Sequence, residues 1–205
     1  MKLQAAIDRV TLEQAEAYVK AFAGTADIIE IGTSLVKDYG LLNLKPLNAL
    51  KGTTRLLADL KTSDEGDYEF KQGYAQGFDL LTAMGTASRA TLEKCYAASQ
   101  AAGKEMMIDL LECDDRRIAE IAGFTDAVYC LHTSIDKGQT PDPAGEVRRF
   151  KMRFPGIRRI AIAGGVGIGA LPALREQGTE IVIVGAAITG APEPIKMLEM
   201  FRKEC

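Results

Sequence analysis

The chain has 205 residues, of which 47% are hydrophobic and 26% are charged, and its formal net charge at pH 7 is −3. This composition is typical of a globular protein with a sizeable core. The negative balance argues against nucleic acid or an anionic membrane as the main partner. No apolar stretch approaches the roughly 20 residues that span a bilayer, and the first ten residues do not resemble a signal peptide. The 4 cysteines match no zinc or redox spacing, so we expect a soluble, cytoplasmic protein.

Short apolar runs alternate along the chain with longer amphipathic segments. The runs that predict strands are residues 3–8, 27–32, 54–61, 78–84, 105–111, 126–132, 158–165 and 180–187. The segments that predict helices are residues 11–22, 41–50, 70–77, 88–103, 114–123, 143–154, 169–178 and 192–204. Several runs are almost continuously apolar, as expected of parallel strands that are covered on both faces. Two helical segments carry unfavourable residues, Pro46 and Gly73.

Eight strand–helix units in a chain of this length predict an α/β fold, a single (β/α)8 TIM barrel with short loops. A doubly wound sheet would show the same alternation and is the alternative. No linker, low-complexity segment or shift in composition divides the chain, so we expect one domain over residues 1–205.

Polar residues stand where the predicted strands end, which is where such barrels carry their active sites. They are Asp8, Glu30, Asp59, Lys61, Asp64, Asp109 and His132, which is the only histidine. A carboxylate in a buried strand, such as Glu30 or Asp59, is costly unless it is paired or binds a metal. Several carboxylates beside one lysine would repel each other without a cation, and oxygen ligands favour Mg²⁺ over zinc. As alternatives, Asp8 could cap the helix that begins at Thr11, and a lone histidine is often structural.

The last two predicted strands end in glycine. Gly164 and Gly165 follow the seventh strand, and Gly185 and Ala186 follow the eighth. Glycine lets backbone N–H groups approach an anion, and many barrels bind phosphate after strands seven and eight. Tight turns also use glycine, so the phosphate role rests on the occurrence of glycine after both strands.

Asp59-x-Lys61-x-x-Asp64 resembles the D-x-K-x-x-D signature of the orotidine 5′-monophosphate decarboxylase superfamily. The whole chain resembles the metal-dependent branch that includes 3-hexulose-6-phosphate synthase and 3-keto-L-gulonate-6-phosphate decarboxylase. The segments that carry this likeness are "AAID", "IIEIGT", "LADLK", "AIAGG" and "IVGAAIT", together with His132. The signature alone could arise by accident, but this set in this order is specific for the branch.

The resemblance implies a homodimeric lyase that acts on a phosphorylated ketose through a 1,2-enediolate. It implies that Glu30 and Asp59 bind Mg²⁺, and that His132 is the acid/base. It also implies that Asp8 and Lys61 contact substrate hydroxyls and that Asp64 reaches into the neighbouring subunit's site. The expected phosphate contacts are Gly164, Gly165, Gly185 and Ala186, although many relatives place an arginine at the position of Ala186.

Two positions distinguish the two activities of the branch. The decarboxylase pattern has an arginine three residues after the histidine, where this chain has Ile135. Asp109 stands where the decarboxylase is expected to have Glu and the synthase Asp. Both positions favour the aldol reaction of formaldehyde with D-ribulose 5-phosphate. The alternatives are decarboxylation of 3-keto-L-gulonate 6-phosphate and a non-catalytic phosphosugar-binding protein.

Overall fold

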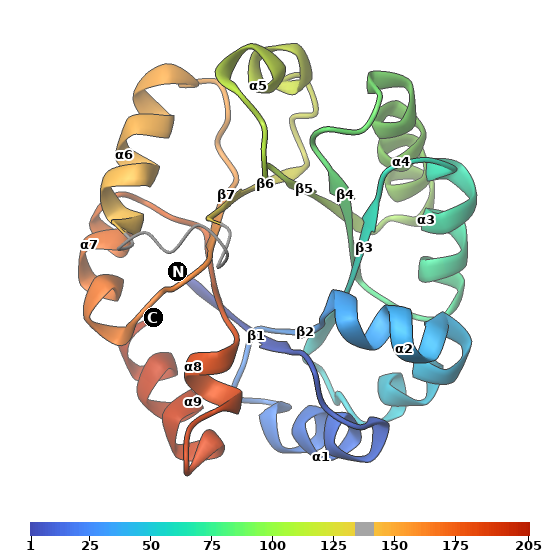
Figure 1. Cartoon of the computed structure of the whole chain (residues 1–205), viewed down its shortest axis with the longest axis vertical. Coiled ribbons are helices and arrows are strands. Elements are labelled where there is room, and N and C mark those ends of the chain that lie inside the picture. Colours follow the sequence, from blue (N-terminus) through green and yellow to red (C-terminus); the bar gives the residue numbers. More distant parts are fainter. Residues whose placement is uncertain (134–141) are drawn as a thin grey trace.

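Eight parallel strands form a closed barrel in a computed structural model, which describes residues 1–133 and 142–205. Each strand pairs with the next along the chain, and β8 pairs with β1. The strands are β1 (Lys2–Ile7), β2 (Ile28–Ile31), β3 (Arg55–Thr62), β4 (Leu80–Met84), β5 (Glu105–Asp109), β6 (Val128–His132), β7 (Ile160–Ala163) and β8 (Ile181–Val184). Figure 1 looks into this barrel, with the helices arranged around it. The predicted (β/α)8 barrel is confirmed.

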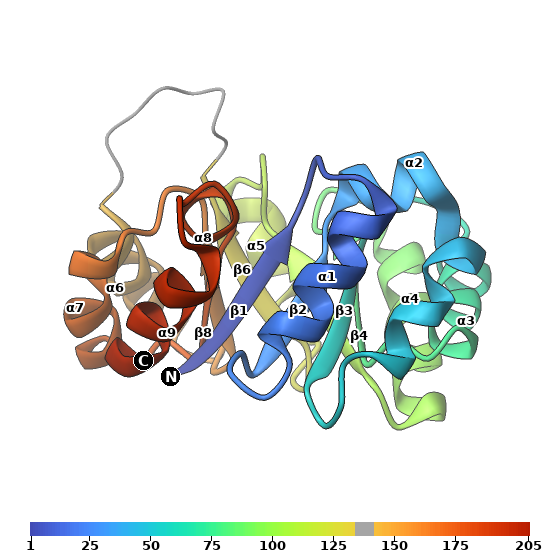
Figure 2. The same ribbon diagram turned by 90° about the horizontal axis from the view of Figure 1, so that it is seen from below.

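The helices follow the strands in alternation. They are α1 (Leu12–Phe22), α2 (Thr33–Leu44), α3 (Gly66–Ala75), α4 (Arg89–Ala102), α5 (Asp115–Ile121), α6 (Pro143–Arg153), α7 (Leu171–Glu176), α8 (Ala186–Thr189) and α9 (Pro194–Glu204), with 3₁₀ segments η1 (Lys45–Ala49) and η3 (Ile168–Ala170). None of the helices in the described part of the chain combines the length and the apolar character that a membrane span requires. Figure 2 shows the barrel from the side, with both termini near the end opposite α8.

The second helix differs from the sequence prediction. The predicted helix over residues 41–50 is wrong in its bounds, because α2 begins at Thr33, directly after β2. It is kinked at Gly40, whose φ is 73°, and it gives way to η1 at Lys45. Pro46 lacks an N–H group and cannot continue an α-helix, which explains the change to a 3₁₀ segment at this point. The sequence prediction also missed the short helix α8.

The barrel interior is apolar at one end and polar at the other. Its apolar residues are Ala6, Ile28, Leu57, Leu80, Met107, Val128, Cys130, Ala161, Ala163, Ile181 and Ile183. Because side chains alternate across a strand, a residue two positions further along also faces the interior. On β2 to β6 this next residue is polar, in the order Glu30, Asp59, Thr82, Asp109 and His132. A polar layer therefore closes the apolar interior at the C-terminal ends of the strands.

A network of ion pairs connects the N-terminal ends of five strands. Arg159 lies 2.7 Å from Glu180 and 3.1 Å from Glu105. Lys2 lies 3.0 Å from Glu180, and Arg55 lies 3.1 Å from Glu105. These contacts connect the starts of β1, β3, β5, β7 and β8, which places the ionic network at the end of the barrel away from the polar layer.

Candidate active site

The end of β3 carries a local distortion that places Asp59 and Lys61. Lys61 has a φ of 49°, a left-handed conformation that is uncommon for a residue with a side chain, and the pairing of β3 with β4 shifts here. Its N–H donates to the Thr82 hydroxyl at 2.9 Å, and that hydroxyl donates to Asp59 Oδ1 at 2.6 Å. The Thr33 hydroxyl donates to Asp59 Oδ2. Thr82 therefore links the distorted backbone directly to the carboxylate.

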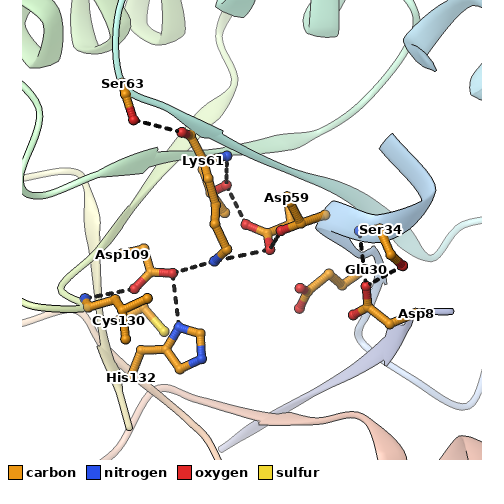
Figure 3. A network of polar contacts seen from close by, with 12 residues as sticks. Asp8, Glu30, Ser34, Asp59, Lys61, Ser63, Asp109, Cys130 and His132 are labelled. Carbon is orange, nitrogen blue, oxygen red and sulfur yellow. Dashed lines mark hydrogen bonds and ion pairs between the residues drawn. The ribbon is translucent and has the colours of Figure 1, made fainter. Parts of the chain in front are cut away.

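The Lys61 side chain lies between two carboxylates, as Figure 3 shows. Its Nζ is 2.6 Å from Asp109 Oδ2 and 3.2 Å from Asp59 Oδ2. Burial alone would lower the pKa of Lys61, but the charges of Asp59 and Asp109 outweigh burial and raise it. Lys61 is therefore an ammonium at neutral pH. It cannot act as a general base, but it can stabilise negative charge that develops on a substrate.

Asp109 joins Lys61 to His132. Its Oδ2 lies 2.9 Å from His132 Nδ1, and its Oδ1 accepts the Leu111 N–H at 2.9 Å. Burial acts to raise the pKa of Asp109, but the hydrogen bond with His132 and the charge of Lys61 outweigh it and lower the pKa to about 2. An ionised carboxylate only accepts hydrogen bonds, so His132 carries a proton on Nδ1. This leaves Nε2 of His132 to exchange protons with a substrate.

Glu30 is the second buried carboxylate of the polar layer, with 8% of its surface exposed. The Gln4 carboxamide donates to Glu30 Oε2 at 2.6 Å. Burial, followed by repulsion from Asp59, raises the pKa of Glu30 to about 8. Positive charge placed beside Glu30 and Asp59 would favour the ionised form of Glu30.

The residues present fit a magnesium ion. No three His, Cys, Asp or Glu side chains converge as a complete ligand set within residues 1–133 and 142–205. Glu30 and Asp59 instead line a cavity of about 40 Å³, together with Gln4, Lys61, Thr82, Asp109 and His132. Mg²⁺ is commonly held by one or two carboxylates and completes its octahedron with water and substrate oxygens. Burial is the larger cause of the raised pKa of Glu30, and a divalent cation would relieve the second cause, which is repulsion from Asp59.

Two of the predicted acidic site residues, Asp8 and Asp64, lie outside this cavity. Asp8 is exposed, and its Oδ1 accepts the Ser34 hydroxyl at 2.7 Å and the Ser34 N–H at 3.2 Å. Asp64 is exposed in the bend before α3. The predicted substrate contact of Asp8 and the predicted reach of Asp64 into a second subunit stay predictions. Ile135 lies outside the described residues, so the distinction drawn from it also stays a prediction.

The glycines after β7 and β8 lie on neighbouring strand ends at the same end of the barrel. Gly164 and Gly165 have φ values of 94° and 68°. A Cβ on Gly164 would lie 2.3 Å from the Thr133 carbonyl oxygen, so this position requires glycine for packing. Gly185 precedes α8, where Ala186 is exposed. Their predicted role in binding phosphate stays a prediction.

Three residues of this site were missed by reasoning from the sequence. Gln4, Thr33 and Thr82 each donate a hydrogen bond to Glu30 or Asp59. For Gln4 a signal was present, because it lies on the same face of β1 as Ala6 and is polar within a buried strand.

A larger cavity of about 570 Å³ lies between α5 and α6, and of the predicted site residues only His132 lines it within the described part of the chain.

Comparisons with known proteins identify the family of the chain. Residues 1–201 match the orotidine 5′-phosphate decarboxylase / HUMPS family. The chain belongs to this family. It is 32% identical to a 3-hexulose-6-phosphate synthase of Mycobacterium gastri, over 95% of this chain and 94% of that protein. A 3-hexulose-6-phosphate synthase of Bacillus subtilis is 31% identical over 94% and 93% of the two chains.

Solved structures of the family superimpose closely on the barrel. A crystal structure of a 3-hexulose-6-phosphate synthase has a TM-score of 0.89 at 31% identity, covering 100% of this chain and 99% of that one. The enzyme of the same name from Salmonella typhimurium has a TM-score of 0.90 at 28% identity, with 100% and 98% coverage. The protein is accordingly a carbon–carbon lyase of the orotidine 5′-phosphate decarboxylase / HUMPS family.

Proposed function

We propose that the protein catalyses the Mg²⁺-dependent aldol condensation of formaldehyde with D-ribulose 5-phosphate, which gives D-arabino-hex-3-ulose 6-phosphate. Full-length similarity to proteins named 3-hexulose-6-phosphate synthase supports the reaction. The observation that carries the mechanism is the chain of contacts from Lys61 through Asp109 to His132, because it supplies an oriented base beside a fixed positive charge.

His132 is the proposed acid/base. With Nδ1 held by Asp109, its Nε2 removes a proton from C1 of the ketose, and the electron pair moves into a 1,2-enediolate. C1 then forms the new bond to the formaldehyde carbon, and the imidazolium returns a proton to the former aldehyde oxygen. Asp109, with its lowered pKa, stays ionised throughout and stabilises the imidazolium.

Lys61, Glu30 and Asp59 provide the electrostatic part of the mechanism. Lys61 stays charged and offers its ammonium to the developing enediolate oxygen. Glu30 and Asp59 would hold the cation, which when bound polarises the ketose carbonyl as a Lewis acid. Thr33 and Thr82 fix the Asp59 carboxylate, so that it need not reorganise during the reaction.

Substrate placement and assembly complete the proposal. The N–H groups of Gly165, Gly185 and Ala186 would hold the phosphate next to the cavity, and Asp8 would contact a hydroxyl at its rim. Asp64 would serve the site of a second subunit in a homodimer. Its exposure beside α3 supports this arrangement, because it leaves the side chain accessible to a partner.

The test follows formaldehyde consumption by the purified protein with D-ribulose 5-phosphate and Mg²⁺, with EDTA as the control. A parallel reaction supplies 3-keto-L-gulonate 6-phosphate and measures CO₂ release. We expect metal-dependent formaldehyde uptake that is much faster than decarboxylation, and a fall of about 10²- to 10⁴-fold in His132→Ala.

The other outcomes each have a definite meaning. Faster decarboxylation would assign the alternative activity of the branch. Binding of the phosphosugar without either reaction would show a binding protein. Full aldol activity in His132→Ala would remove the proposed base.

A further inference from the structure

Gln4 occupies an unusual place on the inner face of β1. Its side chain is completely buried, with 0% of the residue exposed, and it lines the cavity that also holds Glu30 and Asp59. Apart from Gln4, the buried interior face of β1 carries the small apolar residue Ala6. A buried carboxamide at such a position needs a physical reason, because burial of a polar group is unfavourable unless its hydrogen bonds are made.

Only one end of this carboxamide is satisfied by the described residues. Nε2 donates to Glu30 Oε2 at 2.6 Å, whereas Oε1 is buried and has no hydrogen-bond partner in residues 1–133 and 142–205. An unpaired buried acceptor disfavours the folded state. An apolar side chain of similar length would fill the same space without this penalty, so the fold alone does not favour glutamine here.

The Glu30 carboxylate explains why a glutamine is buried at position 4. Glu30 is 8% exposed, and Asp59 lies close enough to repel it. A neutral N–H donor holds a carboxylate in one orientation and stabilises its charge without competing with a cation. A lysine at this position would repel a divalent cation, and a glutamate would add a further negative charge. Glutamine donates a hydrogen bond to the Glu30 carboxylate and adds no charge to the site.

We propose that Gln4 is a positioning residue of the cation site, which orients Glu30 for a divalent metal at the expense of the stability of the metal-free barrel. This inference rests on the proposed function, because it takes Glu30 and Asp59 as the metal ligands. Gln4 would act on the metal through its hydrogen bond to Glu30. Residues that hydrogen-bond to a metal ligand commonly change metal affinity by about 10- to 100-fold when they are replaced.

The test compares the full chain with Gln4→Met, which keeps the length of the side chain and removes the donor. Thr179→Val is the matched control, because Thr179 Oγ1 is also buried without a partner among the described residues but lies just before β8, at the opposite end of the barrel. Mn²⁺, which prefers the same oxygen ligands, is titrated into each protein and the unbound ion is followed by EPR. Thermal unfolding is measured in EDTA.

We expect Gln4→Met to bind Mn²⁺ at least about 10-fold more weakly than the unmodified protein and to unfold in EDTA at the same or a higher temperature. Thr179→Val should bind Mn²⁺ with unchanged affinity. A purely structural glutamine would give the opposite result in EDTA, because its replacement would lower the unfolding temperature.

Three results would overturn the inference. Unchanged affinity in Gln4→Met would show that Gln4 does not act on the site, whereas a lower unfolding temperature in EDTA would give it a structural role. If Gln4→Met does not fold, the same measurements are made on Gln4→Leu, and failure of both variants to fold would also make the residue structural. If the unmodified protein binds no Mn²⁺, the proposed metal ligands fail first, and this outcome is distinguishable from a defect confined to the variant.

Discussion

Glu30→Gln should stabilise the metal-free protein, and increasingly so as the pH rises. The pKa of Glu30 is raised from 4.5 to about 8 in the folded protein, by burial and then by Asp59. Between these two values the folded protein keeps a proton that the unfolded chain has lost. The stabilising contribution of protonated Glu30 is therefore complete below pH 4.5 and is lost as the pH rises through about 8. Glutamine replaces the protonated acid by a neutral group that does not titrate.

The size of the effect follows from the two pKa values. One pH unit of pKa difference corresponds to about 1.4 kcal/mol. Linkage then gives a penalty from Glu30 of about 1 kcal/mol at pH 5 and about 4 kcal/mol at pH 8. The difference in the free energy of unfolding between Glu30→Gln and the unmodified protein should consequently grow by about 3 kcal/mol between these pH values.

Urea denaturation in EDTA at pH 5 and pH 8 measures this difference. Glu199→Gln is the control, because Glu199 lies exposed on α9 and its replacement should leave the pH dependence unchanged. Saturating Mg²⁺ should stabilise the unmodified protein and have little effect on Glu30→Gln. If the difference in unfolding free energy between the two proteins is the same at pH 5 and pH 8, the raised pKa of Glu30 and the reasoning built on it are refuted.

Three further changes test other parts of the molecule. Thr82→Val removes the hydroxyl that links the Lys61 backbone to Asp59, and we expect kcat for the proposed aldol reaction to fall about 10- to 100-fold while the barrel still folds. Arg159→Met should lower the free energy of unfolding by about 2 kcal/mol in urea, because it leaves Glu105 and Glu180 without their shared partner. Mixing inactive Asp64→Asn with inactive His132→Ala, then unfolding and refolding them together, should restore about a quarter of the activity if each site uses residues of both subunits.

Each of these changes has a control and an outcome that contradicts it. Unchanged kcat in Thr82→Val would show that Thr33 alone suffices to place Asp59. Arg149→Met removes an exposed pair with Asp142 and should change stability by less than about 0.5 kcal/mol, so an equal loss in both arginine variants would count against the ionic network. No recovery of activity after mixing would exclude a site shared between subunits.

The barrel was predictable because its pattern is local and repeated. Each strand is a short apolar run, and each helix has an apolar face, so alternation along the sequence fixes the class of fold. The second helix was misplaced because the apolar residues around Pro46 resemble a helical face. The backbone there forms a 3₁₀ segment instead, and the true helix starts at Thr33, directly after β2. No apolar periodicity marks α8, which is only four residues long.

The charged part of the site was predictable, but in its neutral part only Gln4 left a signal in the sequence. Glu30, Asp59 and Asp109 stand out because carboxylates are rare in buried strands. Gln4 and Thr82 act only through contacts with residues on neighbouring strands, and such partners are not visible in a single sequence. The sequence also suggested that all the acidic residues converge, whereas Asp8 is exposed and hydrogen-bonds to Ser34, and Asp64 is exposed in the bend before α3.

The left-handed backbone of Lys61 has a consequence for protein design. For a residue with a side chain this conformation costs on the order of 1 kcal/mol, and glycine would adopt it without strain. A sequence optimised only for the stability of this backbone would therefore place glycine at position 61. The same optimisation would replace Glu30 by a neutral residue, since burial and the charge of Asp59 make its own charge unfavourable. A redesign guided by folding energy alone would therefore give a more stable barrel that lacks Lys61 and Glu30, two residues of the candidate active site.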